Sequence, residues 1–191
     1  MLIPLNQDRY LMPVTPFHMG PGLLIKAVLQ GYFSLIIFGW AQVLIDIQPV
    51  LAIVTGMGTV HGFSHTYPGA VLIAIIAAVS GKWVYRWCMR FMEKDFSDYQ
   101  KRLFDVPVKL TAGISISSAL IGTISHVLLD SIMHPDVEPF FPVNTQNHLA
   151  LVLSIGTLYR LCVYSGLLGL VIYICVRMLR IKFSARAGQV S

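Results

Sequence analysis

Long apolar segments constrain the fold of this chain more than any other feature of its sequence. The regions 67–87, 110–133 and 149–179 each hold the roughly 20 apolar residues that cross the hydrocarbon of a bilayer as a helix. Charged residues make up 12% of the chain, about half the share usual in soluble domains, and the mean hydropathy is +0.69. This composition excludes intrinsic disorder. It predicts one all-α, multi-pass membrane domain over residues 1–191.

A further apolar region, 22–45, is interrupted in its middle by Gln30-Gly31-Tyr32. One straight helix would separate His18 from Asp46 by about 40 Å, at 1.5 Å per residue. Two short helices joined near Gly31 would instead return Asp46 to the level of His18. Such a re-entrant hairpin is tolerated where the protein buries its turn. We therefore expect an N-terminal re-entrant hairpin and about three spanning helices, with a single straight span as the alternative.

Basic residues predict the orientation of the chain in the membrane. They gather in the link after the second apolar region and again after the fourth: Lys82, Arg86, Arg90, Lys94, Lys101, Arg102, Arg177, Arg180, Lys182 and Arg186. The positive-inside rule places both groups in the cytoplasm, together with a short tail at 183–191. The link 93–105 is expected to be a solvated helix or loop, and residues 1–17 an irregular segment. The segments 46–66 and 131–148 then face the other side.

Other function classes leave little trace in the sequence. The net charge of +5 is explained by residues that flank membrane segments, and no basic–aromatic face predicts a nucleic-acid partner. The three cysteines, Cys88, Cys162 and Cys175, have neither metal-binding spacing nor the number of a disulfide framework. No Gly-x-Ser-x-Gly elbow or glycine-rich phosphate loop occurs. The sequence does not predict an oligomeric state.

Histidines and aspartates are placed where an apolar chain would not be expected to carry them. All six histidines fall on the predicted non-cytoplasmic side. Ionisable groups next to membrane segments usually mark function. His126 and Asp130 are four apart and share one helix face, and His61 and His65 would do the same in a helix. Such pairs supply the nitrogen and oxygen donors that a divalent metal binds at about 2.0–2.2 Å.

We therefore predict a site for one or two divalent ions, with Zn²⁺ as the first choice. The expected metal ligands are His18, Asp46, His61, His126 and Asp130. His65 and His134 are the expected proton-transfer residues, because histidine titrates near neutral pH. His148 and Glu138 are expected to be plain loop residues, whereas for His134 and Asp136 a structural role is an equal alternative.

The order of these residues resembles a known family. His18 is followed by Leu44-Ile45-Asp46-Ile47, then by His61-Gly62-Phe63-Ser64-His65-Thr66 and by His126-Val127-Leu128-Leu129-Asp130. This order is similar to that of the bacterial inner-membrane metal-dependent hydrolases, over about residues 15–145. That family typically has Thr-His, Pro-Asp-x-Asp, His-Arg-Gly-x-Thr-His-Ser and His-x-x-x-Asp. Phe17, Ile45, Gln48 and Gly62 depart from these motifs.

The same ligand order is distantly similar to that of zinc-dependent phospholipase C and its nuclease relatives, which are all-helical phosphoesterases with several zinc ions. This resemblance implies that Asp46, His61, His126 and Asp130 hold one metal. It also implies that His18 helps to hold a second metal, with Asp130 as a bridge.

The main hypothesis is a metal-dependent hydrolase in the bacterial inner membrane. Metal-activated water would cleave a phosphoester or a lipid-linked substrate at the outer interface, among membrane lipids. One alternative is a non-catalytic protein with a structural metal site, or a small metal-ion transporter. Another is a membrane adaptor that binds a cytoplasmic partner through the basic link 82–109.

Overall fold

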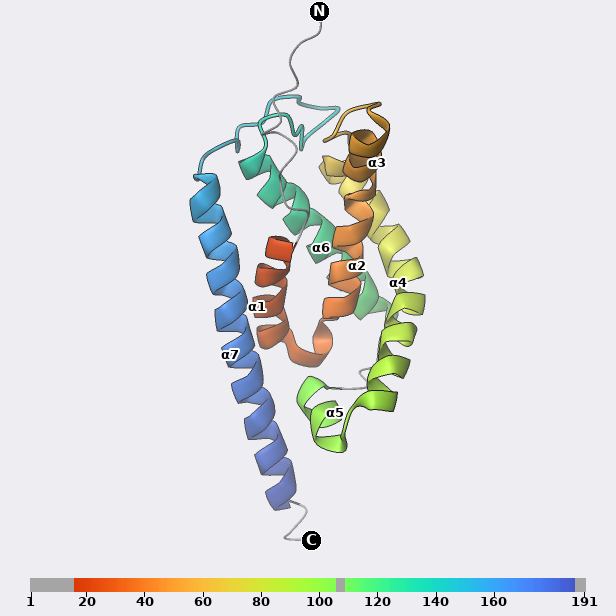
Figure 1. Ribbon diagram of the computed structural model, residues 1–191, viewed down its shortest axis with the longest axis vertical. Coiled ribbons are helices and arrows are strands. Elements are labelled where there is room, and N and C mark those ends of the chain that lie inside the picture. Colours follow the sequence, from red (N-terminus) through yellow and green to blue (C-terminus); the bar gives the residue numbers. More distant parts are fainter. Residues whose placement is uncertain (1–15, 106–108, 188–191) are drawn as a thin grey trace, which may run out of the picture.

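The structure is a computed structural model that describes residues 16–105 and 109–187, and within these ranges it is helical and contains no strand. Figure 1 shows the helices gathered into one bundle, as predicted from composition. In chain order the elements are η2 (Pro16–His18), α1 (Met19–Leu29), η3 (Gln30–Tyr32), α2 (Leu35–Ile45), α3 (Ile47–Thr55), η4 (Phe63–His65), α4 (Tyr67–Asp95), α5 (Asp98–Phe104), α6 (Ala112–Met133) and α7 (Ile155–Ala187).

The interrupted first region folds as a hairpin and not as one straight helix. Helix α1 ends where Gln30 adopts a positive φ of 49°, and α2 begins after Ser34, whose side chain accepts a hydrogen bond from the backbone N–H of Ile37. Inside the turn, Nζ of Lys26 donates to the carbonyl oxygens of Gln30 at 2.6 Å and Phe33 at 2.9 Å. The chain itself thus supplies a hydrogen-bond donor to two carbonyl groups of the turn, as a turn outside water requires.

Four helical stretches in the described part of the chain are long and apolar enough to cross a membrane, which indicates a membrane protein. They are Leu35–Thr55, Tyr67–Asp95, Ala112–Met133 and Ile155–Ser184. The last three correspond to the predicted spans. The first is additional, because α3 continues α2 beyond Asp46 and the two together reach spanning length.

Several boundaries differ from the sequence predictions. Helix α7 starts six residues later than the fourth apolar region and continues to Ala187, so the expected tail at 183–191 is helical over its first part. The expected irregular N-terminal segment lies outside the described residues up to position 15, and residues 16–18 form a 3₁₀ turn. By contrast, the link 93–105 agrees with the expected solvated helix or loop, since it contains the short capped helix α5, which has no buried residue.

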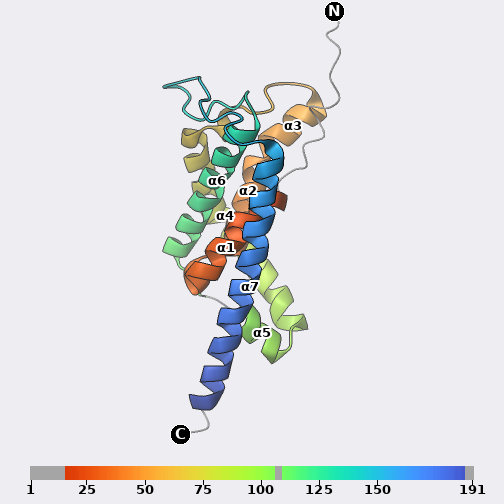
Figure 2. The same cartoon turned by 90° about the vertical axis from the view of Figure 1, so that its left-hand side faces the viewer.

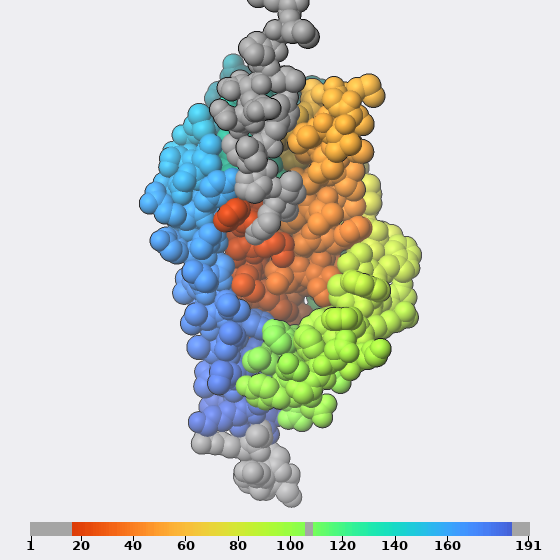
Figure 3. Space-filling view, in the orientation of Figure 1, coloured from red at the N-terminus to blue at the C-terminus, as the bar shows by residue number. Residues whose placement is uncertain are grey.

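Small residues allow the helices to approach closely, which is the usual packing device in membranes. A Cβ atom built on Gly169 of α7 would lie 2.5 Å from the backbone nitrogen of Leu24 in α1. A Cβ on Gly122 of α6 would lie 3.0 Å from the carbonyl oxygen of Phe38 in α2. Helix α2 also packs on α4 through a core rich in alanine. Figure 3 shows the resulting order, with the α1–α2 hairpin inserted between α7 and the α4–α5 region.

The two ends of the bundle differ. At one end, here called the histidine end, lie α3, the segment 56–66 and the segment 134–154, which arches over α6 in Figure 2. That second segment is fixed to the bundle, since the backbone N–H of Tyr67 donates to the carbonyl of Pro139 at 2.8 Å. At the other end, here called the basic end, α5 reaches α7, where Asp105 and Arg177 form an ion pair of 2.9 Å.

Candidate metal centre

Four side chains converge at the histidine end and form what we call the inner group: Asp46, His65, His126 and Asp130. Each offers one ligand atom, and these atoms all lie within 4.8 Å of one another. Nε2 of His126 is 3.1 Å from Oδ1 of Asp46 and 3.1 Å from Oδ2 of Asp130. Nε2 of His65 is 3.0 Å from the same Oδ2 of Asp130. Two imidazoles and two carboxylates thus face a common point.

Three separate parts of the fold bring these residues together. His126 and Asp130 project from one face of α6, as their four-residue spacing predicts. Asp46 lies at the junction between α2 and α3, and the hairpin places this junction against α6. His65 belongs to η4, which is held against α3 because the backbone N–H of Ser64 donates to Oε1 of Gln48 at 2.8 Å.

The inner group has more nitrogen lone pairs than hydrogen-bond partners. His65 and His126 are both 1% exposed. Their Nε2 atoms lie close to carboxylate oxygens, but in directions that form no hydrogen bond with any described residue. Buried polar atoms normally find a partner, so such atoms need an explanation. A cation between the nitrogens and the carboxylate oxygens would satisfy all of them, and this donor set suits Zn²⁺ or a similar ion.

Gln42 fixes the orientation of the His126 ring. Its Nε2 donates to the carbonyl of Gly122 at 3.1 Å, which turns Oε1 toward Nδ1 of His126, with which it makes a short contact. Because Oε1 can only accept, Nδ1 of His126 carries a proton, so in the neutral ring Nε2 presents its lone pair. Outer partners of this kind orient histidine ligands in metal sites. Sequence reasoning missed Gln42, although it is a polar residue one helical turn before Asp46 in an otherwise apolar run.

His18 lies on the other side of the Asp130 carboxylate. Its Nε2 is 3.5 Å from Oδ1 of Asp130, while Oδ2 of the same carboxylate faces His65 and His126. The His18 and His126 rings meet edge to face, with centroids 4.6 Å apart. Burial lowers the pKa of His18 to about 4 and also lowers that of His65, so both rings are neutral at pH 7 and able to act as ligands. The arrangement is compatible with Asp130 as a bridge between two ions.

The two histidines of the segment 61–65 do not share a helix face, because only residues 63–65 form a 3₁₀ turn. His65, predicted as a proton-transfer residue, belongs to the inner group. His61, predicted as a ligand of the same metal, lies beside this group and pairs instead with Asp136. The condition under which both rings would share a helical face is therefore not met, because the backbone between α3 and η4 is irregular.

The other predicted residues, His134, Glu138 and His148, lie outside the inner group. His134, the second residue predicted for proton transfer, follows the last residue of α6 and stacks on His61 with ring centroids 4.4 Å apart. Burial lowers the pKa of His134. Glu138 and His148 are exposed and belong to neither of the metal-type groups found among the described residues, as expected for loop residues. The cysteines are free and take no part.

Comparisons with protein-family models, with curated proteins and with solved structures found no match. The resemblance to metal-dependent hydrolases therefore stays a prediction, and the functional argument depends on the geometry of the site.

Proposed function

We propose that the protein is a membrane-embedded metal-dependent hydrolase whose inner group binds Zn²⁺ or a similar divalent ion. The observation that carries the proposal is the pair of buried Nε2 atoms, of His65 and His126, which face two carboxylates without hydrogen bonds. A bound ion would lower the pKa of a water molecule toward about 7 and polarise the group to be cleaved.

The residues of the chain have distinct tasks in this proposal. Asp46, His65, His126 and Asp130 hold the ion, and Gln42 keeps the His126 lone pair directed at it. In this proposal His18 supports a second ion, since its Nε2 lies 3.5 Å from Oδ1 of Asp130, the oxygen that does not face His65 and His126. Because His65 and His134 both lie in ligand-forming groups, we propose no separate proton-transfer role for either of them.

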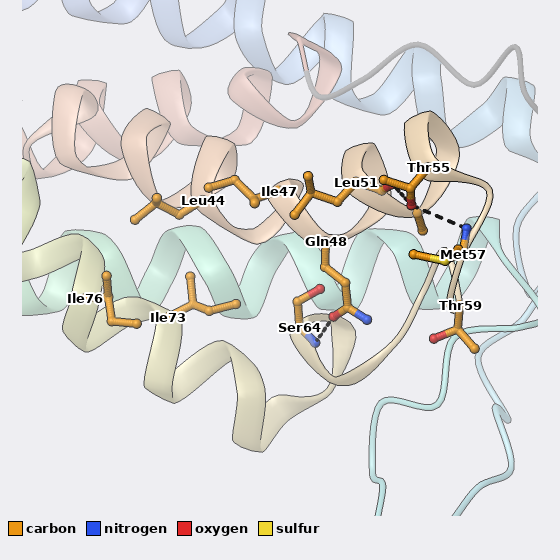
Figure 4. A pocket seen from close by; sticks show the side chains of 12 residues that line it. Leu44, Ile47, Gln48, Leu51, Thr55, Met57, Thr59, Ser64, Ile73 and Ile76 are labelled. Atoms are coloured by element: carbon orange, nitrogen blue, oxygen red, sulfur yellow. Dashed lines mark hydrogen bonds between the residues drawn. The ribbon is translucent and has the colours of Figure 1, made fainter.

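An apolar groove beside the inner group supports an amphiphilic substrate. Figure 4 shows it between α3 and α4, with Leu51 and Ile73 among the side chains on its two walls. Its volume is about 620 Å³, within the range of small-molecule sites. Gln48 and Ser64 supply polar atoms to its lining, and Oγ of Ser64 is 2.9 Å from Nδ1 of His65. The lining of the groove thus contacts His65 through Ser64, although no histidine lines the groove itself.

We therefore propose that the substrate carries an acyl or prenyl chain, which occupies the groove, and a phosphoester, which reaches the inner group. Hydrolysis would add water across one P–O bond of that ester. Most of the membrane-flanking basic residues, among them Lys94, Arg102 and Arg180, lie at the opposite end of the chain's spans. By the positive-inside rule this supports a site on the non-cytoplasmic side of a bacterial inner membrane.

The test uses the full-length protein purified in detergent. Its zinc content is measured by mass spectrometry, together with hydrolysis of a phospholipid and of a soluble nitrophenyl phosphodiester. We expect bound zinc and metal-dependent turnover, both lost in Asp130→Asn and both kept in the exposed-residue control His148→Gln. Zinc without turnover of either substrate would favour the structural metal site. Unchanged zinc content in Asp130→Asn would refute the ligand assignment.

A further inference from the structure

We infer that the chain has a second, separate binding site for a divalent cation, formed by His61, His134 and Asp136. We call these residues the outer triad. It shares no residue with the inner group, and it does not depend on the proposed hydrolase activity. Its ligand atoms, two imidazole nitrogens and one carboxylate oxygen, all lie within 4.8 Å of one another.

The contacts within the outer triad bring nitrogen and oxygen donors to one place. Nδ1 of His61 is 2.9 Å from Oδ2 of Asp136, and the rings of His61 and His134 stack at 4.4 Å with an interplanar angle of 30°. Two imidazoles and one carboxylate form a frequent donor set of catalytic zinc sites, in which the remaining position holds water or substrate. The class of ligand is therefore a borderline divalent ion such as Zn²⁺.

The backbone around His134 is fixed before any ion binds. Nδ2 of Asn147 donates to the carbonyl oxygens of Ser131 at 2.9 Å and His134 at 3.0 Å, which ties the segment 134–154 to the end of α6. The backbone N–H of Val137 donates to the same His134 carbonyl at 3.2 Å, and the Val137 side chain is fully buried. Asp136 is thus held between two anchored residues.

The backbone around His61 is fixed as well. A Cβ atom on Gly62 would lie 1.8 Å from Nε2 of Gln48, so the backbone there packs on the end of a side chain carried by α3, whose Oε1 also accepts from the backbone N–H of Ser64. The backbone N–H of His65 donates to the carbonyl of Gly62 at 3.0 Å and closes the turn that follows. A site whose donors are held by such supports binds its ion with little reorganisation.

The outer triad differs from the inner group in its exposure. The side chain of Asp136 is 66% exposed and that of His61 is 11% exposed, whereas Asp130 in the inner group is 7% exposed. The rings of His61 and His65 meet edge to face at 5.2 Å, so the two sites share a wall. An ion in the outer triad would keep solvent ligands and exchange faster than an ion in the inner group.

The competing interpretation is a plain His61–Asp136 hydrogen bond that stabilises the loop. It predicts that Asp136→Asn lowers the melting temperature and leaves the metal content unchanged. The cation site predicts that Asp136→Asn lowers the metal content, because an amide oxygen is a much weaker zinc ligand than a carboxylate. It predicts an unchanged melting temperature, because an exposed isosteric substitution should not disturb the fold.

The experiment loads chelator-stripped full-length protein in detergent with Zn²⁺ and measures bound zinc per chain after dialysis. We expect Asp136→Asn and His134→Gln each to lose one equivalent relative to wild type. The matched controls Glu138→Gln and His148→Gln, on the same loop, should keep the wild-type content. Brief treatment of the wild type with a chelator should remove this same equivalent first.

The second-site inference is overturned if Asp136→Asn and His134→Gln both keep the wild-type zinc content. Asp130→Asn separates it from the proposed function. If Asp130→Asn keeps all of its zinc while Asp136→Asn loses one equivalent, the inner assignment fails and the outer site stands. If zinc is lost in Asp130→Asn alone, the outer site fails and the inner group stands.

Discussion

The two ends of the α1–α2 hairpin both bury polar side chains, but they satisfy them differently. At the basic end, Lys26 donates to two turn carbonyls, and Arg177 pairs with Asp105 and donates to the carbonyl of Arg102. One acceptor, Oε1 of Gln30, lacks a partner there among the described residues. At the histidine end, three buried ring nitrogens lack one: Nδ1 of His18 and Nε2 of His65 and His126.

The difference is that the basic end is closed by its own charges, whereas the histidine end has the composition of a candidate metal site. The basic end supplies its own cations, and their protons are directed at carbonyl and carboxylate oxygens that close the bundle. The histidine end supplies only lone pairs and carboxylates around one point, so its charge is balanced when a cation enters. Burial of polar side chains is therefore common to both ends, whereas several unpartnered ring nitrogens beside carboxylates are found only at the histidine end among the described residues.

Removing a carboxylate from the histidine end should have the largest effect. Asp130 faces His18 with one oxygen and both His65 and His126 with the other. We expect Asp130→Asn to weaken zinc binding by more than about 100-fold. Loss of a residue that only hydrogen-bonds to a metal ligand already lowers metal affinity by about 10–100-fold, and loss of a ligand should cost more. Competition with a fluorescent zinc chelator measures the affinity. A change below tenfold would mean that Asp130 is not a ligand.

The matched change at the basic end should act on stability and not on metal. Arg177→Met leaves the partly buried Asp105 without its ion-pair partner. We expect a loss of about 2 kcal/mol in unfolding free energy, below the 3–5 kcal/mol typical of fully buried pairs. Thermal unfolding in detergent measures the loss, and the double variant Arg177→Met/Asp105→Asn should recover part of it. Zinc content should equal that of the wild type; a decrease would contradict the division between the two ends.

The histidine end was more accessible to sequence reasoning than the basic end, for a physical reason. His126 and Asp130 are related by helical spacing, and Asp46 closes an apolar run, so local rules were enough to predict their convergence. Lys26 is the lone charge within the region 22–45, yet its partners are backbone carbonyls, which any sequence offers. Its role follows only from the turn that the hairpin creates.

The structure departs from the sequence predictions in three places, each for a different physical reason. That His65 and not His61 lies in the inner group depends on the path of residues 56–66, which has no periodicity to read. Gln42 was missed because its importance comes from a long-range contact with His126 across two helices. The extent of α7 was misjudged because Arg180 and Lys182 suit a polar helix end as well as a tail.

A smaller effect should follow from replacing Gln42, which contacts the proposed ligand His126 on its Nδ1 side. Gln42→Leu removes the acceptor that orients His126 and leaves a buried Nδ1–H group without its partner. We expect zinc affinity to fall about tenfold, the lower range for lost outer partners. Zinc titration against the same chelator provides the measurement. Gln42→Glu keeps an acceptor oxygen at this position and should restore most of the affinity, which a purely structural role of Gln42 would not predict.

The smallest predicted effect concerns the apolar groove, because it alters only how a substrate chain lies next to the histidine end. Ala52 lines the groove on α3 and is half-buried, so Ala52→Phe fills part of the volume without touching the inner group. We expect kcat/KM for a long-chain phospholipid to fall a few-fold, while kcat/KM for the soluble nitrophenyl phosphodiester and the zinc content stay unchanged. A matched substitution on the lipid-facing side of α7, Leu167→Phe, should change neither. An equal loss for both substrates would show that the groove does not hold the chain, since a narrower groove discriminates only against the substrate that enters it.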